Sequence, residues 1–458
     1  MAFHPRLRYF LAGSGTFAAL WLSLNVTAAR VGQTFPGRSE TRVEVQERSI
    51  PAEKSRITSQ PLPAEFINVA GPIDAAATAE TRRLHVHLAM LAYREGFAFG
   101  MQGDHHGGVG WDDKPDGNGI VPDSDLFKVA GVDAGVSGYN VNWLFDAANN
   151  ADPKGIQMLG EEIRAAHARG EIITIHWPMT NPETGTDDRN CPDCSHLIDT
   201  VLSPNLQGEQ GRHYLTWKRW MDVFADFLAN EAWFYQNGVR TPIPVLFRPW
   251  HEMNQGEDGR GRWYQVANNS PEEYNALWQQ TVTYLRDQRG IHQVLYVYAP
   301  SLNALACDGC DPNRAYLENY PGDAWIDVMA GDGYFAGIDD EARLMNVANG
   351  IRIIADTATA HRKIPALSET GFKDGLQHNL DQDFWYAQWL TSMRGLSGPS
   401  LNRMAYVMTW SNSGSLTKPG FFVPYLPGSA EAQDFRTFRD DRATLFANEL
   451  LALFDGPP

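Results

Sequence analysis

Apolar residues recur along this chain with the two spacings that distinguish helices from strands. Residues 79–96 place Leu84, Leu88 and Leu91 at helical spacing, which predicts an amphipathic helix. Further helical patterns cover residues 156–169, 214–236 and 271–288. The last of these begins with Ser270, Pro271 and Glu273, the arrangement of a capping box with proline at the first helical position.

Short apolar runs alternate with these helical patterns and predict buried strands. The runs lie at 97–100, 139–145, 171–177, 242–250, 294–300, 325–334, 364–369 and 404–410. Eight strands alternating with helices over one stretch of chain predict an α/β fold, a (β/α)8 TIM barrel with long loops on its C-terminal face. A doubly wound open sheet is the alternative, but the segment after the first strand lacks the G-x-G-x-x-G spacing of a nucleotide site.

The N-terminal region has a different character from the rest. Residues 1–29 combine arginines, an apolar stretch and a small-residue cleavage site, and they predict a secretory signal peptide, with a membrane anchor as the alternative. Residues 30–77 are rich in charge, proline, serine and threonine and predict a linker or tether. Residues 78–458 then form the barrel domain. These features predict a secreted protein, extracellular or periplasmic, without stable membrane insertion once the signal is removed.

The charge balance restricts the partners of this domain. The chain has 38 Lys and Arg against 55 Asp and Glu, a net charge of -17, which would repel nucleic acids and anionic lipids. A neutral or cationic partner fits better.

Polar residues follow the apolar run at 242–246 in the sequence FRPWHEMN, residues 247–254. Alternation along a strand would turn Arg248, Trp250 and Glu252 towards the barrel axis, with Glu252 uppermost at the C-terminal mouth. There a carboxyl group beside apolar rings can remain protonated and act as a general acid.

A second carboxylate closes the seventh strand, where Glu369 ends the run at 364–369. The sixth strand adds Asp332 and Tyr334, and the eighth adds Trp410. Two glutamates and aromatic rings around one mouth are what a glycosidase requires, because one carboxyl protonates the leaving oxygen and the other attacks the anomeric carbon.

The motifs RPWHEMN, SETGF, YPGDAWIDVMAGDGY and MTWSN resemble glycoside hydrolase family 26, whose best-known members are endo-β-1,4-mannanases. The resemblance covers roughly residues 80–455. It implies a retaining mechanism with Glu252 as acid/base and Glu369 as nucleophile. It also implies that His251 and Tyr334 position the substrate and the nucleophile, and that Trp410 is a sugar platform.

The sequence departs from this family's pattern after the FRPWHEMN motif. Residues 255–265, QGEDGRGRWYQ, form a charged, glycine-rich insertion where a glycine and a tight run of aromatics are usual. We expect Trp263 in this insertion to stack on sugars, with packing on the barrel rim as the alternative. His176 either takes the place of the family's histidine or is a core histidine. Together the candidate substrate-binding residues are His251, Tyr334, Trp410, Trp177, Arg248 and Trp263.

The four cysteines form two C-x-x-C pairs, at 191–194 and 307–310, in loops at the predicted active-site face. In an exported protein they predict disulfides, and a zinc site is the alternative. His105 and His106 are expected to belong to a polar loop, since no third metal ligand is evident. No cofactor and no catalytic metal are therefore expected.

The sequence thus predicts a secreted, monomeric glycosidase that cleaves β-1,4-mannosidic linkages in a neutral polysaccharide. The same chemistry on β-1,3-xylan or mixed-linkage β-glucan is the nearest alternative. A non-catalytic carbohydrate-binding barrel and a metal-dependent hydrolase using the cysteines and histidines are the others.

Overall fold

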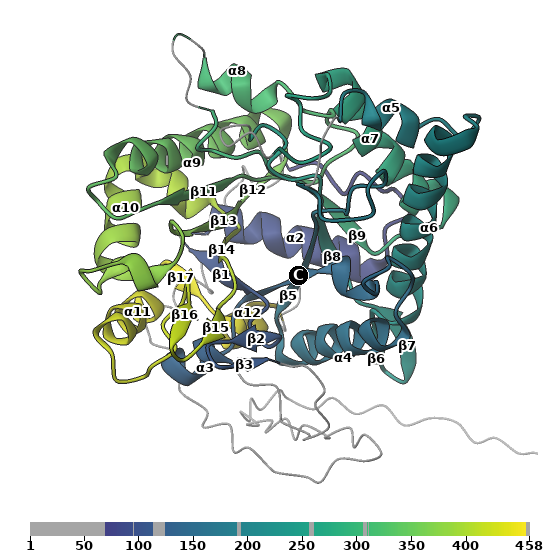
Figure 1. Cartoon of the computed structure of the whole chain (residues 1–458). Helices are drawn as coiled ribbons and strands as arrows, with labels where there is room; N and C mark the ends of the chain where they lie inside the picture. The colour runs from purple at the N-terminus through teal and green to yellow at the C-terminus, as the bar shows by residue number, and fades with distance from the viewer. Residues whose placement is uncertain are drawn as a thin grey trace, which may run out of the picture. The chain divides into compact units, whose positions relative to one another are not determined.

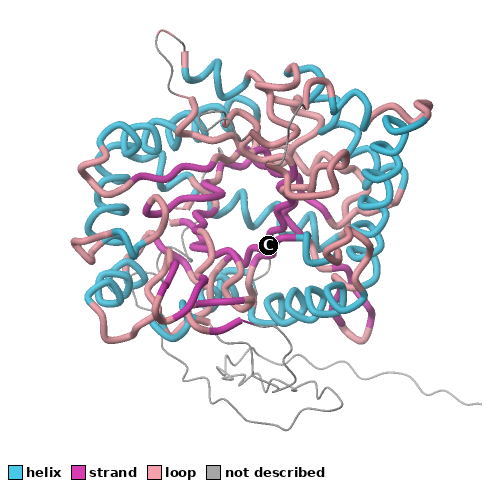
Figure 2. Tube along the Cα trace, viewed as in Figure 1, coloured by secondary structure: helices cyan, strands magenta, loops and turns pink. Residues whose placement is uncertain are grey.

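Parallel strands form an inner ring in the computed structural model of this chain, and helices cover the outside of the ring (Figures 1 and 2). The structure describes residues 69–94, 96–112, 124–189, 194–255, 261–305, 309 and 311–454. The predicted signal peptide, residues 1–29, lies outside the described residues, as do residues 30–68 of the predicted linker.

Eight strand positions close the barrel, which confirms the predicted (β/α)8 fold. In chain order the strands are β1 (Phe97–Gln102), β4 (Val136–Asn140), β5 (Ile172–Trp177), β8 (Val245–Pro249), β9 (Val294–Tyr298), β10 (Val328–Met329) with β11 (Asp332–Phe335), β12 (Ile364–Pro365) with β13 (Leu367–Phe372), and β14 (Tyr406–Thr409). Each pairs in parallel with the next, and β14 returns to β1 through the register Ala98 to Tyr406. β17 (Thr444–Leu445) adds a short strand beside β1.

The helices connect these strands. They are α2 (Ala79–Tyr93), α3 (Asp125–Ala130), α4 (Pro153–Arg169), α5 (Leu197–Val201), α6 (Gly208–Asn230), α7 (Pro271–Thr283), α8 (Pro312–Leu317), α9 (Glu341–His361), α10 (Thr391–Ser397), α11 (Ala430–Asp440) and α12 (Ala447–Phe454). The predicted capping box at the start of α7 is present, with Ser270 and Glu273 each bonding the other's backbone N–H. No helix of the described residues is long and apolar enough to cross a membrane.

Helix α2 crosses behind the ring of strands in Figure 1 and packs against the interior of the barrel. Its Leu84, Leu88 and Leu91, the residues that predicted the helix, are buried against interior residues such as Leu246 and Val328. The residues just before it contact the same end, since Ile73 donates its N–H to Asp327 at 2.8 Å. The opposite end of the barrel, where the strands finish, is therefore the end available for a site.

Among the predicted elements whose bounds differ from the structure, one strand and one helix differ most. The second strand occupies 136–140 and a 3-10 turn, Val141–Leu144, follows it, whereas the pattern predicted a strand at 139–145. Gly138 weakens the apolar pattern there, because its missing Cβ leaves room for the side chain of Gln102 inside the barrel. The predicted helix 214–236 ends at Asn230, and the hairpin of β6 (Trp233–Gln236) and β7 (Val239–Pro242) follows. Its turn, Asn237-Gly238, has positive φ at both residues, as a tight hairpin requires.

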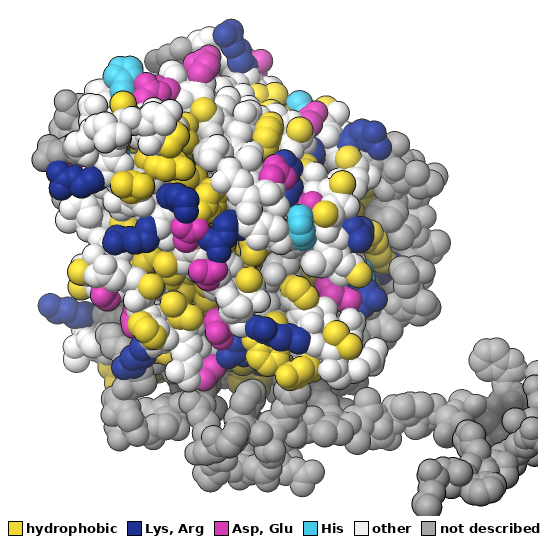
Figure 3. All heavy atoms as spheres, turned by 90° about the vertical axis from the view of Figure 1, so that its right-hand side faces the viewer, with side chains coloured by type: hydrophobic (Ala, Val, Ile, Leu, Met, Phe, Trp, Pro, Cys, Tyr) yellow, Lys and Arg dark blue, Asp and Glu magenta, His cyan; other side chains and the backbone are white. Residues whose placement is uncertain are grey.

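The face of the molecule that carries α6 shows basic and acidic side chains interspersed, with neither sign gathered into one patch (Figure 3). On this face the negative net charge produces no extended surface of a single sign.

Candidate active site

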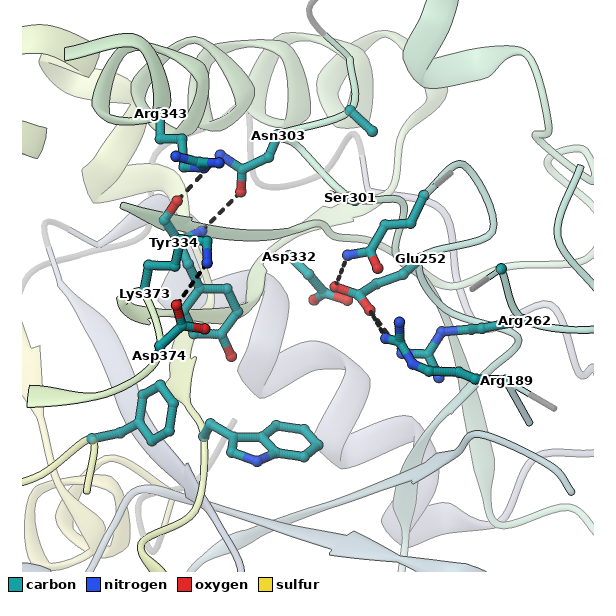
Figure 4. A pocket seen from close by; sticks show the side chains of 15 residues that line it. Arg189, Glu252, Arg262, Ser301, Asn303, Asp332, Tyr334, Arg343, Lys373 and Asp374 are labelled. Atoms are coloured by element: carbon teal, nitrogen blue, oxygen red, sulfur yellow. Dashed lines mark hydrogen bonds and ion pairs between the residues drawn. The ribbon is translucent and has the colours of Figure 1, made fainter. Parts of the chain in front are cut away.

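A cavity of about 550 Å³ opens at the C-terminal ends of the strands. Glu252, Asp332, Tyr334 and Trp410 line it, together with cationic side chains from the surrounding loops (Figure 4). This is the end of the barrel at which the sequence predicted the chemistry, and four of the residues that it singled out meet there.

Glu369 on β13 lies beside this cavity in a buried network. Its Oε1 accepts a hydrogen bond from Arg248 Nη2, and its Oε2 accepts one from the Tyr334 hydroxyl at 2.9 Å. Arg248 also donates through Nη1 to Asp332 Oδ2 at 2.6 Å. Burial raises the pKa of Glu369, and the Arg248 guanidinium and the Tyr334 hydroxyl oppose that rise. Both contacts stabilise a carboxylate at this position.

Asp332 and Glu369 are brought together by strand register. They are direct partners in the pairing of β11 with β13, and Arg248 reaches both from β8. Burial raises the pKa of Asp332 well above its ordinary value, and the Arg248 charge opposes that shift. Ser368 supports the group by donating to Asp332 Oδ1 at 2.7 Å.

Glu252 reaches the cavity by a different route from the predicted one. Strand β8 ends at Pro249, and both Trp250 and Glu252 adopt left-handed backbone with φ of 51° and 55°. The Glu252 N–H donates to Ala299 O at 2.8 Å and ties this turn to the end of β9. Left-handed backbone costs roughly 1–2 kcal/mol per residue, so the packing around the turn has to offset it.

The predicted alternation is therefore wrong for Trp250. Its indole N–H donates to Thr281 in α7 at 3.1 Å, and its ring packs edge-on against Trp263 and Tyr264, outside the barrel. Arg248 faces the axis as predicted. Glu252 reaches the cavity because the turn carries it there.

The carboxyl of Glu252 has two donors in direct contact. Arg262 Nη2 donates to its Oε2 at 2.7 Å, and Gln255 Nε2 donates to its Oε1 at 2.6 Å. Arg189 lies farther away, with Nη2 4.0 Å from Oε2. Sequence reasoning missed Arg262 and Gln255, although both lie in the 255–265 insertion that it had marked as unusual.

Glu252, Asp332 and Glu369 each offer one oxygen within 4.8 Å of the others. Such a cluster is the kind that could hold a divalent cation, but Arg248 and Arg262 already donate to all three carboxyls. The chemistry available is that of paired carboxylates: one able to donate a proton, the other held as a nucleophile.

Two buried histidines, His176 and His251, pack against each other beside Trp410. The rings of His176 and His251 pack edge to face with their centroids 5.6 Å apart. The ring of His176 packs in the same way against Trp410, with centroids 5.4 Å apart. Burial, followed by the charges of Arg248 and Arg262, lowers the pKa of both histidines well below the ordinary value. They are therefore neutral at neutral pH.

Two predicted sugar-binding tryptophans have no surface at the cavity. Trp263 is 0% exposed, and its indole N–H donates to Met179 O at 2.8 Å. Trp177 is 2% exposed and packs on Phe145 and Phe224. The stacking role expected for Trp263 is thus corrected to packing at the barrel rim, and Trp177 likewise packs in the core. Trp410 remains as a ring that lines the cavity.

The loop residues His105 and His106 belong to a polar network and are not among the residues that line the cavity. His105 Nε2 lies 3.3 Å from Asp133, and His106 Nδ1 lies 2.8 Å from Glu162. His105, Asp133 and Glu171 could together approach a metal ion, but Arg169 already pairs with both acids. Among the cysteines, only Cys194 lies within the described residues, where it is buried, so their pairing stays a prediction.

Comparison with known proteins identifies the family. The sequence profile of Glycosyl hydrolase family 26 matches residues 73–394. The chain belongs to this family. This confirms the resemblance found in the motifs, and the family is one of glycoside hydrolases.

Relatives of known structure share the barrel. A GH26 β-mannanase from Bacteroides ovatus is 28% identical, with a TM-score of 0.66 over 82% of this chain and 98% of its own. A modular endo-β-1,4-mannanase from Cellulomonas fimi is 29% identical, with a TM-score of 0.68 over 85% of this chain and 80% of its own. A mannan endo-1,4-β-mannosidase from Bifidobacterium adolescentis is 28% identical over 393 residues, which are 82% of this chain and 35% of that protein. The chain thus spans about a third of that curated relative.

Proposed function

We propose that this protein is a secreted, retaining endo-β-1,4-mannanase that acts on mannan-type polysaccharides, with Glu252 as acid/base and Glu369 as nucleophile. The observation that carries the proposal is the approach of the two carboxyls: an oxygen of Glu252 and an oxygen of Glu369 lie within 4.8 Å of each other beside the cavity. A retaining glycosidase needs its two carboxyl groups about 5–5.5 Å apart, whereas an inverting one needs about 6.5–9.5 Å to admit a water.

The first step forms a covalent intermediate. Glu369 attacks the anomeric carbon while Glu252 gives its proton to the departing glycosidic oxygen. Arg248 and Tyr334 hold Glu369 so that one oxygen of the carboxylate can reach the sugar. In the second step Glu252, now a carboxylate, takes a proton from water as that water attacks the glycosyl-enzyme bond and releases Glu369.

Support for the mannan substrate comes from the relatives, which are named for mannan or mannanase activity. Support for secretion comes from the N-terminal pattern, and the paired cysteines are proposed to be disulfides for the same reason. We assign the protein no cofactor and a monomeric state.

Two alanine variants test the catalytic roles. Glu369→Ala should lower kcat on mannan by about 10⁴-fold or more, since no covalent intermediate forms. Glu252→Ala should lower activity on mannan by about 10²- to 10⁴-fold, yet still give a burst of dinitrophenol from dinitrophenyl β-mannobioside, whose leaving group needs no proton. Glu161→Ala, on the exposed face of α4, is the matched control and should keep full activity.

A substrate panel of mannan, glucomannan, β-1,3-xylan and lichenan tests the choice of polysaccharide. We expect mannan and glucomannan to be cleaved and the β-anomeric configuration to be retained in proton NMR of the first products. Preference for xylan or lichenan would replace the substrate, whereas an inverted product or full activity of either glutamate variant would refute the mechanism.

A further inference from the structure

The carboxyl of Glu252 is held by two side chains that differ in their hydrogen-bonding capacity. Arg262 donates to Oε2 at 2.7 Å (Figure 4), and Gln255 donates to Oε1 at 2.6 Å. Both come from the segment 255–265, where the sequence departs from the usual pattern of its family. A guanidinium can only donate hydrogen bonds, whereas a carboxamide donates through its nitrogen and accepts through its oxygen.

Arg262 is a fixed partner. It is 7% exposed, and its Nη1 forms an ion pair with Asp188 in the loop that follows β5. The neighbouring Trp263 ties the same two loops together, because its N–H donates to Asp188 O at 2.9 Å and its indole donates to Met179 O at 2.8 Å. Moving Arg262 away from Glu252 would break this buried set of contacts.

Gln255 is the partner that can change. Its side chain lines the cavity, and it meets the oxygen of Glu252 that Arg262 leaves free. Rotation of the carboxamide by half a turn exchanges nitrogen for oxygen, so Gln255 can face a carboxylate or a protonated carboxyl. It can also yield its place to the oxygen of a leaving sugar.

From these contacts we infer that Arg262 is a positioning residue for the acid/base, and that Glu252 Oε1 is the oxygen that carries the catalytic proton. This inference rests on the proposed roles of Glu252 and Glu369. Since Arg262 occupies Oε2 with a donor that cannot accept, a proton on that oxygen would face another N–H. The guanidinium therefore fixes the carboxyl plane and leaves Oε1 directed at the bond to be cleaved, in the first step as an acid and in the second as a base.

Arg262→Met tests the inference with two substrates. On mannohexaose, kcat/KM should fall at least tenfold, because a misdirected acid no longer protonates the leaving sugar. On dinitrophenyl β-mannobioside, kcat/KM should stay within about threefold of the wild-type value, since it reports a first step that needs no acid. The kcat on that substrate should fall together with KM, because the misplaced base slows breakdown of the intermediate.

Arg394→Met is the matched control. Arg394 pairs with Asp441 through Nη1 at 2.8 Å, far from the cavity in the α10 region, so its loss removes an arginine ion pair without touching the acid/base. It should leave kcat/KM unchanged on both substrates. If Arg262→Met gives no soluble protein, Asp188→Asn serves instead, since it removes only the anchor of Arg262 and should produce the same substrate difference in weaker form.

Gln255→Met distinguishes the role of Gln255 from that of Arg262. It should lower kcat/KM on mannohexaose only a few-fold, and by a similar factor on the aryl substrate, because the incoming oxygen replaces the carboxamide. A substrate-dependent loss as large as that of Arg262→Met would overturn the assignment of Oε1.

The remaining outcomes are equally decisive. An equal loss of kcat/KM on both substrates in Arg262→Met, or no loss on either, would overturn the positioning role. Glu252→Ala, measured in the same assays, distinguishes a failure of the acid/base role of Glu252 from a failure of the positioning role of Arg262. If Glu252→Ala itself fails to separate the substrates, the proposed acid/base is wrong; if it separates them and Arg262→Met does not, only the inference about Arg262 fails.

Discussion

The two glutamates of the active site have the same kind of partner, built in two different ways. Arg248 bridges Glu369 and Asp332, and Arg262 bridges Glu252 and Asp188. The first group stands on adjacent strands, whose pairing sets Asp332 opposite Glu369. The second group joins two loops and a turn with left-handed residues.

This difference matches the proposed chemistry of the two residues. A nucleophile has to present one oxygen at a fixed point. The hydrogen-bonded strands of the barrel already fix the backbone there, so little further conformational entropy is lost. An acid/base has to gain and lose a proton in every turnover, so one of its oxygens needs a partner that can change. The loops supply a fixed donor in Arg262 and a changeable one in Gln255.

The largest effect is expected at the strand-built group. Arg248→Met would leave Glu369 and Asp332 buried without their cation, which should cost about 3–5 kcal/mol of unfolding free energy. It should also reduce kcat on mannohexaose by about 10³-fold, because the nucleophile is no longer held as a carboxylate. Urea unfolding and steady-state kinetics would measure both quantities. Arg248→Lys keeps the charge and should recover most of the stability and little of the rate; a loss of kcat below tenfold in Arg248→Met would contradict this picture.

The strand-built group is also the part of the site that the sequence could predict. Apolar runs in the sequence predict the strands of a barrel, and a polar residue at the C-terminal end of such a run must lie at the mouth. Glu369, Tyr334 and Arg248 lie at the mouth as this pattern predicts, although the pairing of β13 with β14 shifts its register between Leu367 and Thr370. The order of all eight strands followed from the same signal.

The loop-built group could not be predicted in this way. The alternation of a regular strand predicts that both Glu252 and Trp250 face the cavity. The positive φ of these two residues breaks that alternation, and their residue types give no sign of it. Trp263 was expected to contact the sugar because it follows the acid/base in sequence. A loop has no periodic pattern from which the direction of its side chains could be predicted. Arg262 and Gln255 gave no signal beyond their presence in an unusual segment, because their partner depends on how two loops meet.

Trp263→Ala tests whether the packing of this ring stabilises the loop-built group. The ring is fully buried against Trp250 and Tyr264, so its removal should cost about 3–5 kcal/mol of unfolding free energy. KM for mannohexaose should stay within about twofold of wild type, since the ring meets no sugar, while kcat falls with the loosened Arg262. Thermal unfolding and kinetics would test this, and a raised KM at unchanged stability would restore the stacking role.

Trp410→Ala is the contrasting variant, with a smaller expected effect. Trp410 lines the cavity, so its loss should raise KM for mannohexaose by about five- to tenfold, equivalent to about 1 kcal/mol of ring contact. Its unfolding free energy should change less than that of Trp263→Ala because the ring is only partly buried. Equal effects of the two tryptophans on KM would show that the division between packing and binding surfaces is wrong.

The smallest expected effect is that of a chelator, and it tests both arginine groups together. Glu252, Asp332 and Glu369 lie close enough to bind a cation, yet each already accepts a hydrogen bond from Arg248 or Arg262. A divalent ion among them would lie against two guanidinium groups and lose much of the attraction of the carboxylates. EDTA should therefore leave kcat, KM and the melting temperature of the wild-type protein unchanged. A loss of activity that calcium or zinc restores would show that a metal, and not the two arginines, balances the charge of the site; the same titration on Arg262→Met would then show whether the ion replaces the loop-built partner alone.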